Sequence, residues 1–291
     1  MPQNNEAPRR GMTASRLATG AMRGASVGSA QTENKSPIWL PLPANPRAIS
    51  CASFAPDCDL HEMLGGVEKT DNDYGAHYLV SKQASHYDAH FSTLRERLER
   101  VLEAEKMPTL SGTCVEDLLF VDIETTGLSS GQPLFLIGAL SMQNEAQLDL
   151  FLARDLDEEA AALAAFAQLA HGKTLITFNG KSFDWPYIEG RSRAHRVRPA
   201  SVQNHLDMLH QARRTWKHSL PNCKLQTLEL YLCGRTRIDD INGSEIPRTY
   251  HEFARRHAHN KTGAHLMSPI LHHNALDILT TAELLCILGE K

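Results

Sequence analysis

The chain has 291 residues, of which 42% are hydrophobic and 22% are charged, a balance typical of a folded globular protein. This composition excludes a wholly disordered, collagen-like or disulfide-scaffold chain. Lys and Arg number 30 and Asp and Glu number 34, a formal net charge of −4, so any site for a polyanion must be local.

The cysteines and the apolar runs predict where the protein resides. The six cysteines are dispersed and form no Cys-x-x-Cys pair, which favours reduced thiols. The N-terminus lacks the apolar stretch of a signal peptide, and no apolar run approaches the roughly 18 residues of a membrane span. We therefore expect a cytoplasmic protein without a membrane partner.

Composition divides the chain into three parts. Residues 1–36 are rich in Gly, Ala, Ser, Asn and Gln, which predicts a disordered tail. Residues 37–116 form an N-terminal extension. In it the spacing of Leu94, Leu98 and Val101 predicts an amphipathic helix that begins after Ser92 and ends before Pro108. Residues 117–291 are predicted to form the main domain.

The pattern of the main domain predicts an α/β fold. Apolar runs at 118–123, 134–140 and 148–152 predict three strands connected by hairpins. A helix at 157–170, a strand at 174–178, a helix at 186–191 and a strand at 202–206 follow, and the last helix is predicted at 274–288. This order predicts a mixed central sheet flanked by helices.

The first chemically informative motif is Asp122-Ile123-Glu124, at the end of the first predicted strand. Residues i and i+2 of a strand share a face, so the two carboxylates project together. Two like charges about 4 Å apart cost on the order of 4 kcal/mol at an effective dielectric constant near 20, and a bound divalent cation would reverse that cost. The alternative interpretation is a solvated strand end.

Two further motifs carry polar side chains at defined positions. Residues 177–186 predict a strand, an Asn-Gly turn and a helix entry marked by Asp184, whose simplest role is a helix cap. Residues 272–277 contain His273 and Asp277 four positions apart, on one helix face. The alternative there is an ordinary surface pair.

Together the three motifs resemble the DEDD family of exonucleases in the ribonuclease H-like superfamily. Residues from about 118 to 288 are most similar to the YprB-type ribonuclease H-like domain, in the segments 120–128, 205–210 and 273–277. The resemblance implies a ribonuclease H-like fold and a two-metal 3′–5′ exonuclease that acts on nucleic-acid ends, predominantly single-stranded ones. The related alternative is a structure-selective endonuclease, and a different class is a catalytically silent nucleic-acid-binding module.

The resemblance also implies roles for individual residues. Two Mg²⁺ or Mn²⁺ ions would be held by four carboxylates: Asp122, Glu124, Asp184 and Asp277. Thr125 and Asn179 would contact the terminal nucleotide, and Phe183 would stack on a base, although core packing is an equal alternative for its ring. The general base is expected to be His273, which shares a helix face with Asp277, and His272 remains the alternative.

Basic residues gather after the second motif. Between residues 185 and 240 there are ten Lys and Arg and five Asp and Glu. This segment is a candidate path for a nucleic-acid backbone, and the alternative is a solvated surface. Asp207, which follows a short predicted strand, is expected to cap the next helix rather than to bind metal.

Overall fold

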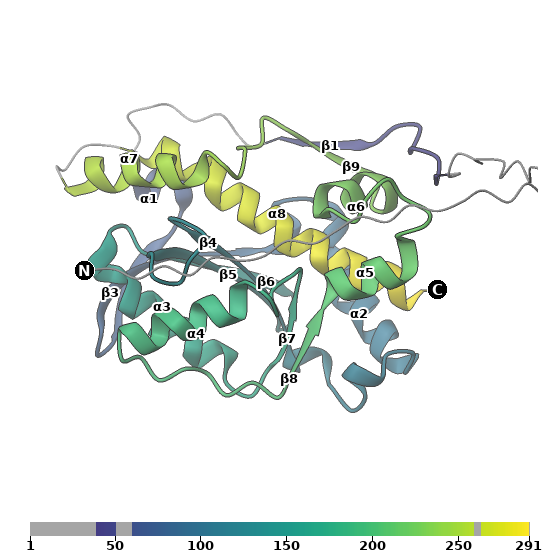
Figure 1. Cartoon of the computed structure of the whole chain (residues 1–291), viewed down its shortest axis with the longest axis horizontal. Helices are drawn as coiled ribbons and strands as arrows, with labels where there is room; N and C mark the ends of the chain where they lie inside the picture. The colour runs from purple at the N-terminus through teal and green to yellow at the C-terminus, as the bar shows by residue number, and fades with distance from the viewer. Residues whose placement is uncertain (1–38, 51–59, 259–262, 291) are drawn as a thin grey trace, which may run out of the picture. The chain divides into compact units, whose positions relative to one another are not determined.

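A seven-stranded sheet organises the fold, in the strand order β2-β3-β6-β5-β4-β7-β8. The computed structural model describes residues 39–50, 60–258 and 263–290 (Figure 1). The strands of this sheet are β2 (Val67–Asn72), β3 (Gly75–Gln83), β4 (Leu118–Thr125), β5 (Leu134–Met142), β6 (Ala146–Leu152), β7 (Thr174–Thr177) and β8 (Asn204–Asp207). Strand β4 pairs antiparallel with β5 and parallel with β7. The predicted mixed sheet and the hairpin connections β4-β5-β6 are confirmed.

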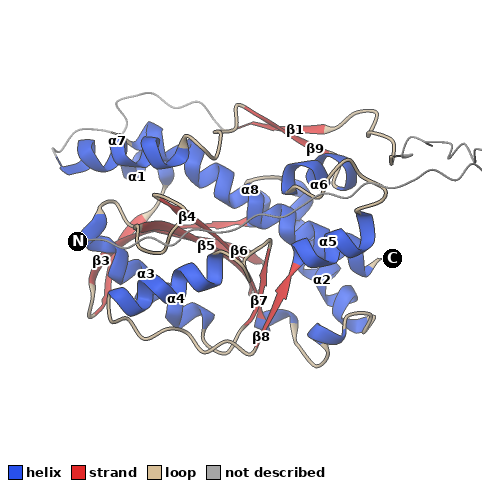
Figure 2. Cartoon of the chain, viewed as in Figure 1, coloured by secondary structure: helices blue, strands red, loops and turns tan. Residues whose placement is uncertain are grey.

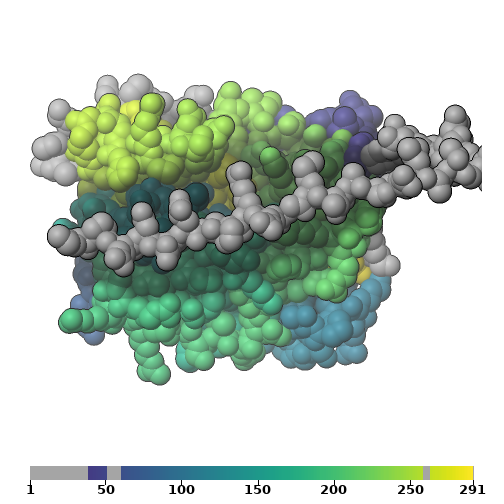
Figure 3. Space-filling model, viewed as in Figure 1, coloured from purple at the N-terminus to yellow at the C-terminus, as the bar shows by residue number. Residues whose placement is uncertain are grey.

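Helices cover both faces of this sheet (Figure 2). They are α1 (Leu60–Leu64), α2 (Leu94–Glu103), α3 (Glu159–Ala170), α4 (Asp184–Ala194), α5 (Met208–Trp216), α6 (Leu225–Leu232), α7 (Ile246–Ala258) and α8 (Ala264–Gly289). Helices α3 and α4 lie on one face, and α8 crosses the other face with α2, α6 and α7 packed on it. In the space-filling view, α7 lies at the top of the molecule and α3 and α4 lie at the bottom (Figure 3).

Alternation along β4 divides the core into two clusters. Leu119, Val121 and Ile123 are buried in the cluster under α3 and α4. Leu118 and Phe120 are buried in the larger cluster under α8. Because side chains alternate along a strand, Asp122 and Glu124 belong to the α8 face.

The N-terminal extension enlarges the sheet, which the sequence pattern did not predict. Strand β3 pairs antiparallel with β6 and carries β2 outside it. The predicted helix of the extension is present as α2. Strand β1 (Arg47–Ser50) pairs in parallel with β9 (Arg235–Ile238) in a separate two-stranded sheet. The predicted tail at residues 1–36 lies outside the described residues.

Helix α8 begins ten residues before the position that its sequence predicts. It contains Pro269, although proline removes a backbone donor from a helix interior. Gly138 of β5 allows the helix to approach the sheet closely, since a Cβ there would lie 2.0 Å from Asn274 Oδ1. The close approach brings residues 273–277 of α8 over β4 and β5.

None of the helices in the described part of the chain combines the length and the apolarity that crossing a bilayer requires.

Candidate active site

Asp122 and Glu124 lie on the α8 face of β4, as the strand alternation requires. Asp122 Oδ2 accepts a hydrogen bond of 2.7 Å from Asn274 Nδ2 of α8. The charges of Asp184, Asp277 and Glu124 all act on Asp122 and raise its pKa. The three motifs that lie far apart in the sequence therefore meet at one place.

Asp184 enters the site as the first residue of α4. It is 5% exposed, and the turn before it is held by Asp207, whose carboxylate oxygens accept from the backbone amides of Asn179 (2.9 Å) and Lys181 (3.1 Å). Asp207 also accepts from the amide of Leu209, so it caps α5 as predicted. Asn179 takes a positive φ of 69°, a conformation that Asn tolerates better than most residues.

The third motif contributes an ion-pair network on α8. Asp277 Oδ1 lies 2.6 Å from Arg237 Nη2, and Asp277 Oδ2 lies 3.7 Å from His273 Nε2. The other ring nitrogen of His273, Nδ1, lies 2.9 Å from Asp240 Oδ1. Both His273 and Arg237 are thus held between acidic partners.

Burial and like charges set the electrostatics of the carboxyl groups. Burial raises the pKa of Glu124 to about 8, and the charges of Asp277 and Asp184 add to this increase while that of His273 opposes it. Burial raises the pKa of Asp184 to about 7, although backbone hydrogen bonds from Asp184 itself and from Ile123 lower it. Burial and the three neighbouring acids raise the pKa of Asp122 well above its usual value. Without a bound cation, the cluster holds protons at neutral pH.

His273 and Asp240 form a hydrogen-bonded pair. Burial alone would lower the pKa of His273, but the hydrogen bond to Asp240 and the charges of Asp277 and Glu124 raise it above the usual value. Burial alone would raise the pKa of Asp240, but its hydrogen bond to His273 and the charges of His273 and Arg237 lower it. Asp240 is therefore an ionised acceptor that fixes the orientation of the imidazole ring.

The four carboxylates suit a divalent metal by their chemistry, because Mg²⁺ and Mn²⁺ prefer oxygen ligands. Asp277 already contacts the guanidinium of Arg237 and the imidazole of His273, so the cluster favours positive charge. Across the described residues, however, no three Asp, Glu, His or Cys side chains stand ready at metal-binding separations. The four carboxylates are suitable ligands for a divalent metal. Asp277 would have to release Arg237 before it could bind the ion.

The two candidate histidines occupy different environments. His273 is 8% exposed and faces Asp277, whereas His272 lines a separate cavity with Lys82 and Tyr87. Burial lowers the pKa of His272. Only His273 stands beside the carboxylate cluster.

The residues that are expected to contact substrate differ in how far their side chains are exposed to solvent. Thr125 Oγ1 donates to the carbonyl oxygen of Gly127 at 2.7 Å and stays half-buried. Phe183 packs against the core under α4, with its ring centroid 5.4 Å from that of Tyr187. Its partial burial matches the core-packing alternative, and one side of the ring stays accessible.

Three residues of the site have no clear signal in the sequence. Asn274 stands inside the third motif, but its contact with Asp122 depends on how α8 crosses β4. Arg237 and Asp240 come from β9 and the turn after it, in a segment that reads as a basic surface. They reach the site through contacts with α6 and α8, which nothing in the local pattern predicts.

Much of the predicted basic segment is neutralised inside the protein. Arg191 binds Glu159, and Arg235 and Arg237 both bind Glu229. A cluster of basic residues on and after α5 lines an open cavity of about 440 Å³ that contains no acidic side chain among its lining residues: Arg213, Arg214 and Lys217, with Asn222 and Cys223.

Comparison with known proteins shows which family the chain belongs to. A family model described as RNase_H superfamily matches residues 119–288. The chain is 32% identical over 208 residues to the uncharacterized protein YprB of Bacillus subtilis (strain 168); the match covers 69% of this chain and 49% of that protein, so the chain spans about half the length of the curated relative it matches. Among solved structures, the family B DNA polymerase of the archaeon Pyrobaculum calidifontis matches 58% of this chain and 27% of its own, with 15% identity and a TM-score of 0.37. On the family match, which covers more than half of its residues, the chain belongs to the RNase H superfamily.

Proposed function

We propose that the protein is a metal-dependent 3′–5′ exonuclease of the DEDD type that hydrolyses phosphodiester bonds at the ends of single-stranded nucleic acid. The observation that carries the proposal is the mutual action of Asp122, Glu124, Asp184 and Asp277, four acids from three distant segments, of which Asp184 is buried and the other three are partly buried. Like charges kept together in a buried site are costly, and a divalent cation is the usual reason to retain them. The membership of the RNase H superfamily supports nuclease chemistry.

Asp122, Glu124, Asp184 and Asp277 would hold two Mg²⁺ or Mn²⁺ ions. Bound divalent cations would supply charge stabilisation to the attacking and leaving oxygens of an in-line displacement. The protein's own part is to hold the four carboxylates on β4, α4 and α8, and to orient Asp122 through Asn274.

His273 is the proposed general base. Its Nδ1 donates a proton to the ionised Asp240, which leaves Nε2 as the acceptor on the side of Asp277. A water molecule bound beside Asp277 would give its proton to Nε2 as it attacks phosphorus. Asp240 would act through His273, as a positioning residue.

The basic cavity at Arg213, Arg214 and Lys217 supports a nucleic-acid substrate. These three cations have no acidic neighbour among the lining residues of the cavity, so they are available to phosphates. The cations of the lining are Arg and Lys side chains, which neutralise phosphates whatever the sequence, so we infer contact with the backbone rather than with the bases.

One observation favours a second candidate, a catalytically silent nucleic-acid-binding module. The Arg237–Asp277 ion pair already supplies a positive charge to the carboxylate cluster. A protein that had lost metal binding would keep such a pair. Metal binding therefore distinguishes the two functions.

The test is a cleavage assay with Mn²⁺ and Mg²⁺ on 5′-labelled single-stranded DNA and RNA, with internally labelled duplexes in parallel. We expect a ladder that shortens from the 3′ end and is absent for Asp122→Asn. The matched control is Asp149→Asn, a carboxylate of β6 on the opposite face of the sheet, which should cleave like the wild type. Cleavage by Asp122→Asn at the normal rate would contradict the assignment, and internal cuts alone would favour an endonuclease.

A further inference from the structure

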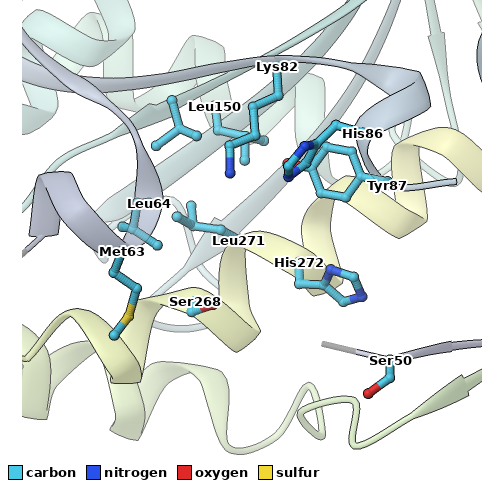
Figure 4. Close-up of a pocket in the computed structure, with 11 residues that line it drawn as sticks. Ser50, Met63, Leu64, Lys82, His86, Tyr87, Leu150, Ser268, Leu271 and His272 are labelled. Atoms are coloured by element: carbon cyan, nitrogen blue, oxygen red, sulfur yellow. The ribbon is translucent and has the colours of Figure 1, made fainter. Parts of the chain in front are cut away.

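A second cavity lies at the junction of the N-terminal extension and α8. Its volume is about 170 Å³, and seven of its eleven lining residues precede residue 119, where the family match begins. Strands β3 and β6 form its floor, α1 and the turn after β3 form two walls, and α8 closes it (Figure 4). The lining residues are Ser50, Met63, Leu64, Val80, Lys82, His86, Tyr87, Leu150, Ser268, Leu271 and His272.

Hydrogen-bond donors gather on one side of this cavity. Figure 4 shows the ends of Lys82, His86 and Tyr87 close to one another, with His272 on α8 below them. The ring centroids of Tyr87 and His86 are 5.5 Å apart, and those of Tyr87 and His272 are 6.0 Å apart. These four side chains can present an ammonium, two imidazoles and a phenol to one ligand.

Lys82 gives this polar side a positive charge, and the charges of Asp240 and Glu229, which lie outside the cavity lining, act on His272. None of the lining residues is acidic, and Lys82 forms no ion pair within the described part of the chain. His272 Nε2 is buried with no hydrogen-bond partner among the described residues. A buried polar atom without a partner is uncommon in folded proteins and indicates a group that a ligand satisfies.

The pKa values of the donor side chains are shifted toward their neutral forms. Burial lowers the pKa of Lys82 and that of His272, and burial together with the charge of Lys82 lowers the pKa of His86. Burial raises the pKa of Tyr87, so its phenol stays a neutral donor. A bound anion would favour the protonated forms of Lys82, His86 and His272 and so oppose these shifts.

The opposite side of the cavity is apolar. Met63, Leu64 and Leu271 face the donors in Figure 4, and Val80 of β3 and Leu150 of β6 also line the cavity. A cavity of about 150 Å³ is large enough to hold benzene. The space is therefore sufficient for one tetrahedral anion and a small organic group attached to it.

The cavity is separate from the carboxylate cluster. Leu150 pairs with Gly138, which pairs with Asp122, so the two sites are two strands apart on the same face of the sheet. On α8, His272 and Asp277 are five residues apart, about 140° around the helix axis. The helix thus separates a positive cavity on one flank from a negative cluster on the other.

We propose that this cavity is a binding site for a phosphate group, either inorganic phosphate or the phosphomonoester of a small molecule, held by Lys82, His86, Tyr87 and His272. Phosphate fits better than carboxylate because it presents more oxygen atoms to the four donor side chains and carries a larger negative charge at neutral pH. The site gives the N-terminal extension a binding role that is independent of the nuclease centre.

The test is a titration of the full chain in metal-free buffer, with inorganic phosphate in one arm and adenosine 5′-monophosphate in the other, followed through the histidine ring resonances by NMR. Both titrations are repeated with Asp122→Asn. This variant excludes phosphate binding to a metal ion retained by the carboxylate cluster. The variants are Lys82→Gln and His272→Gln, and the control is Lys69→Gln, a lysine of the adjacent β2 outside the cavity.

We expect saturable shifts of the His86 and His272 rings, with affinity at least tenfold weaker in Lys82→Gln and in His272→Gln and unchanged in Lys69→Gln and Asp122→Asn. Equal affinity for the two probes would assign the site to phosphate itself, and tighter binding of the nucleotide would assign it to a phosphomonoester. Absence of saturable shifts, equal binding by the folded Lys82→Gln and His272→Gln variants, or an equally strong response to acetate would overturn the proposal.

Discussion

Arg237 Nη2 lies 2.6 Å from Asp277 Oδ1, so the carboxylate cluster on α8 carries an internal cation. The same guanidinium contacts Glu229 at 2.7 Å and Asp240 at 3.4 Å, and its side chain is 5% exposed. Arg237 belongs to β9, which pairs with β1 of the N-terminal extension. The extension thus contributes to the electrostatics of a site whose carboxylates all belong to the main domain.

We expect Arg237→Gln to bind Mn²⁺ more tightly than the wild type, because the competing cation at Asp277 is removed. The metal-free variant should lose stability, by about 3 kcal/mol, since its acidic partners stay buried without their counter-charge. Calorimetric titration with Mn²⁺ and thermal unfolding with and without Mn²⁺ measure the two effects.

The control for this variant is Arg191→Gln, which removes another largely buried arginine from its partner Glu159. It should lower stability without changing Mn²⁺ affinity. Unchanged or weaker Mn²⁺ binding by Arg237→Gln would show that the ion pair does not oppose the metal.

Asp122→Asn should stabilise the metal-free protein, on the order of 1–2 kcal/mol at pH 8, because it removes a buried carboxyl group from three acidic neighbours. The folded-state pKa of Asp122 is raised, so this group costs stability once the pH exceeds its unfolded-state pKa near 4. The gain should therefore grow as the pH rises from about 4, and added Mn²⁺ should stabilise the wild type but not the variant. Thermal unfolding across pH measures both, and a variant less stable than the wild type at pH 8 would contradict the prediction.

His273→Ala should lower the cleavage rate by roughly 10² to 10⁴, the range of general-base catalysis. Asp240→Asn should cause a smaller loss in kcat with little change in KM, because the amide can still contact Nδ1 but carries no charge. The double variant should be no slower than His273→Ala alone, since Asp240 acts through the imidazole. His272→Ala, which alters the neighbouring cavity, should cleave at nearly the wild-type rate, and a loss as large as that of His273→Ala would reverse the choice of base.

His205 should make stability fall in mild acid. Its Nε2 lies 2.8 Å from Thr177 Oγ1, and burial, together with the charge of Lys181, lowers its pKa to about 4. A folded-state pKa below the unfolded value of about 6.5 means that the contribution is complete above pH 6.5 and is lost as the pH falls toward 4. We expect a loss on the order of 2 kcal/mol after allowance for partial exposure.

The pH dependence of urea unfolding measures this effect. His205→Gln should flatten the curve between pH 6.5 and 4, whereas the exposed His251→Gln should leave it unchanged. An unaltered curve for His205→Gln would assign the acid sensitivity to other groups.

Replacing Arg213, Arg214 and Lys217 by Gln should weaken single-stranded nucleic-acid binding and reduce its dependence on salt. If each residue neutralises one phosphate, the slope of log affinity against log salt should fall in magnitude by about 2. Replacement of Arg193, Arg196 and Arg198, from the same basic segment but outside this cavity, is the control. Equal slopes for the two triple variants would indicate that the cavity does not contact the backbone.

The strands β4 to β8 and the helices α2, α3 and α4 could be predicted from the sequence because each carries its own apolar period and its own turn residues. The sequence also determined that Asp122 and Glu124 share a face and that His273 and Asp277 share another, since both follow from the repeat of one element. These features can be predicted from local spacing because the residues involved lie close together in the sequence.

Only the tertiary structure decided how these elements meet. The approach of α8 over Gly138 brings Asn274 to Asp122, and β9, which pairs with β1, brings Arg237 to Asp277. The addition of β2 and β3 to the edge of β6 likewise forms the floor of the cavity at Lys82 and His272. Each of these contacts joins residues more than 100 positions apart or depends on a strand pair with no local sequence pattern. The free energy that favours each contact comes from burying whole faces of helices and sheets, and no single segment supplies it.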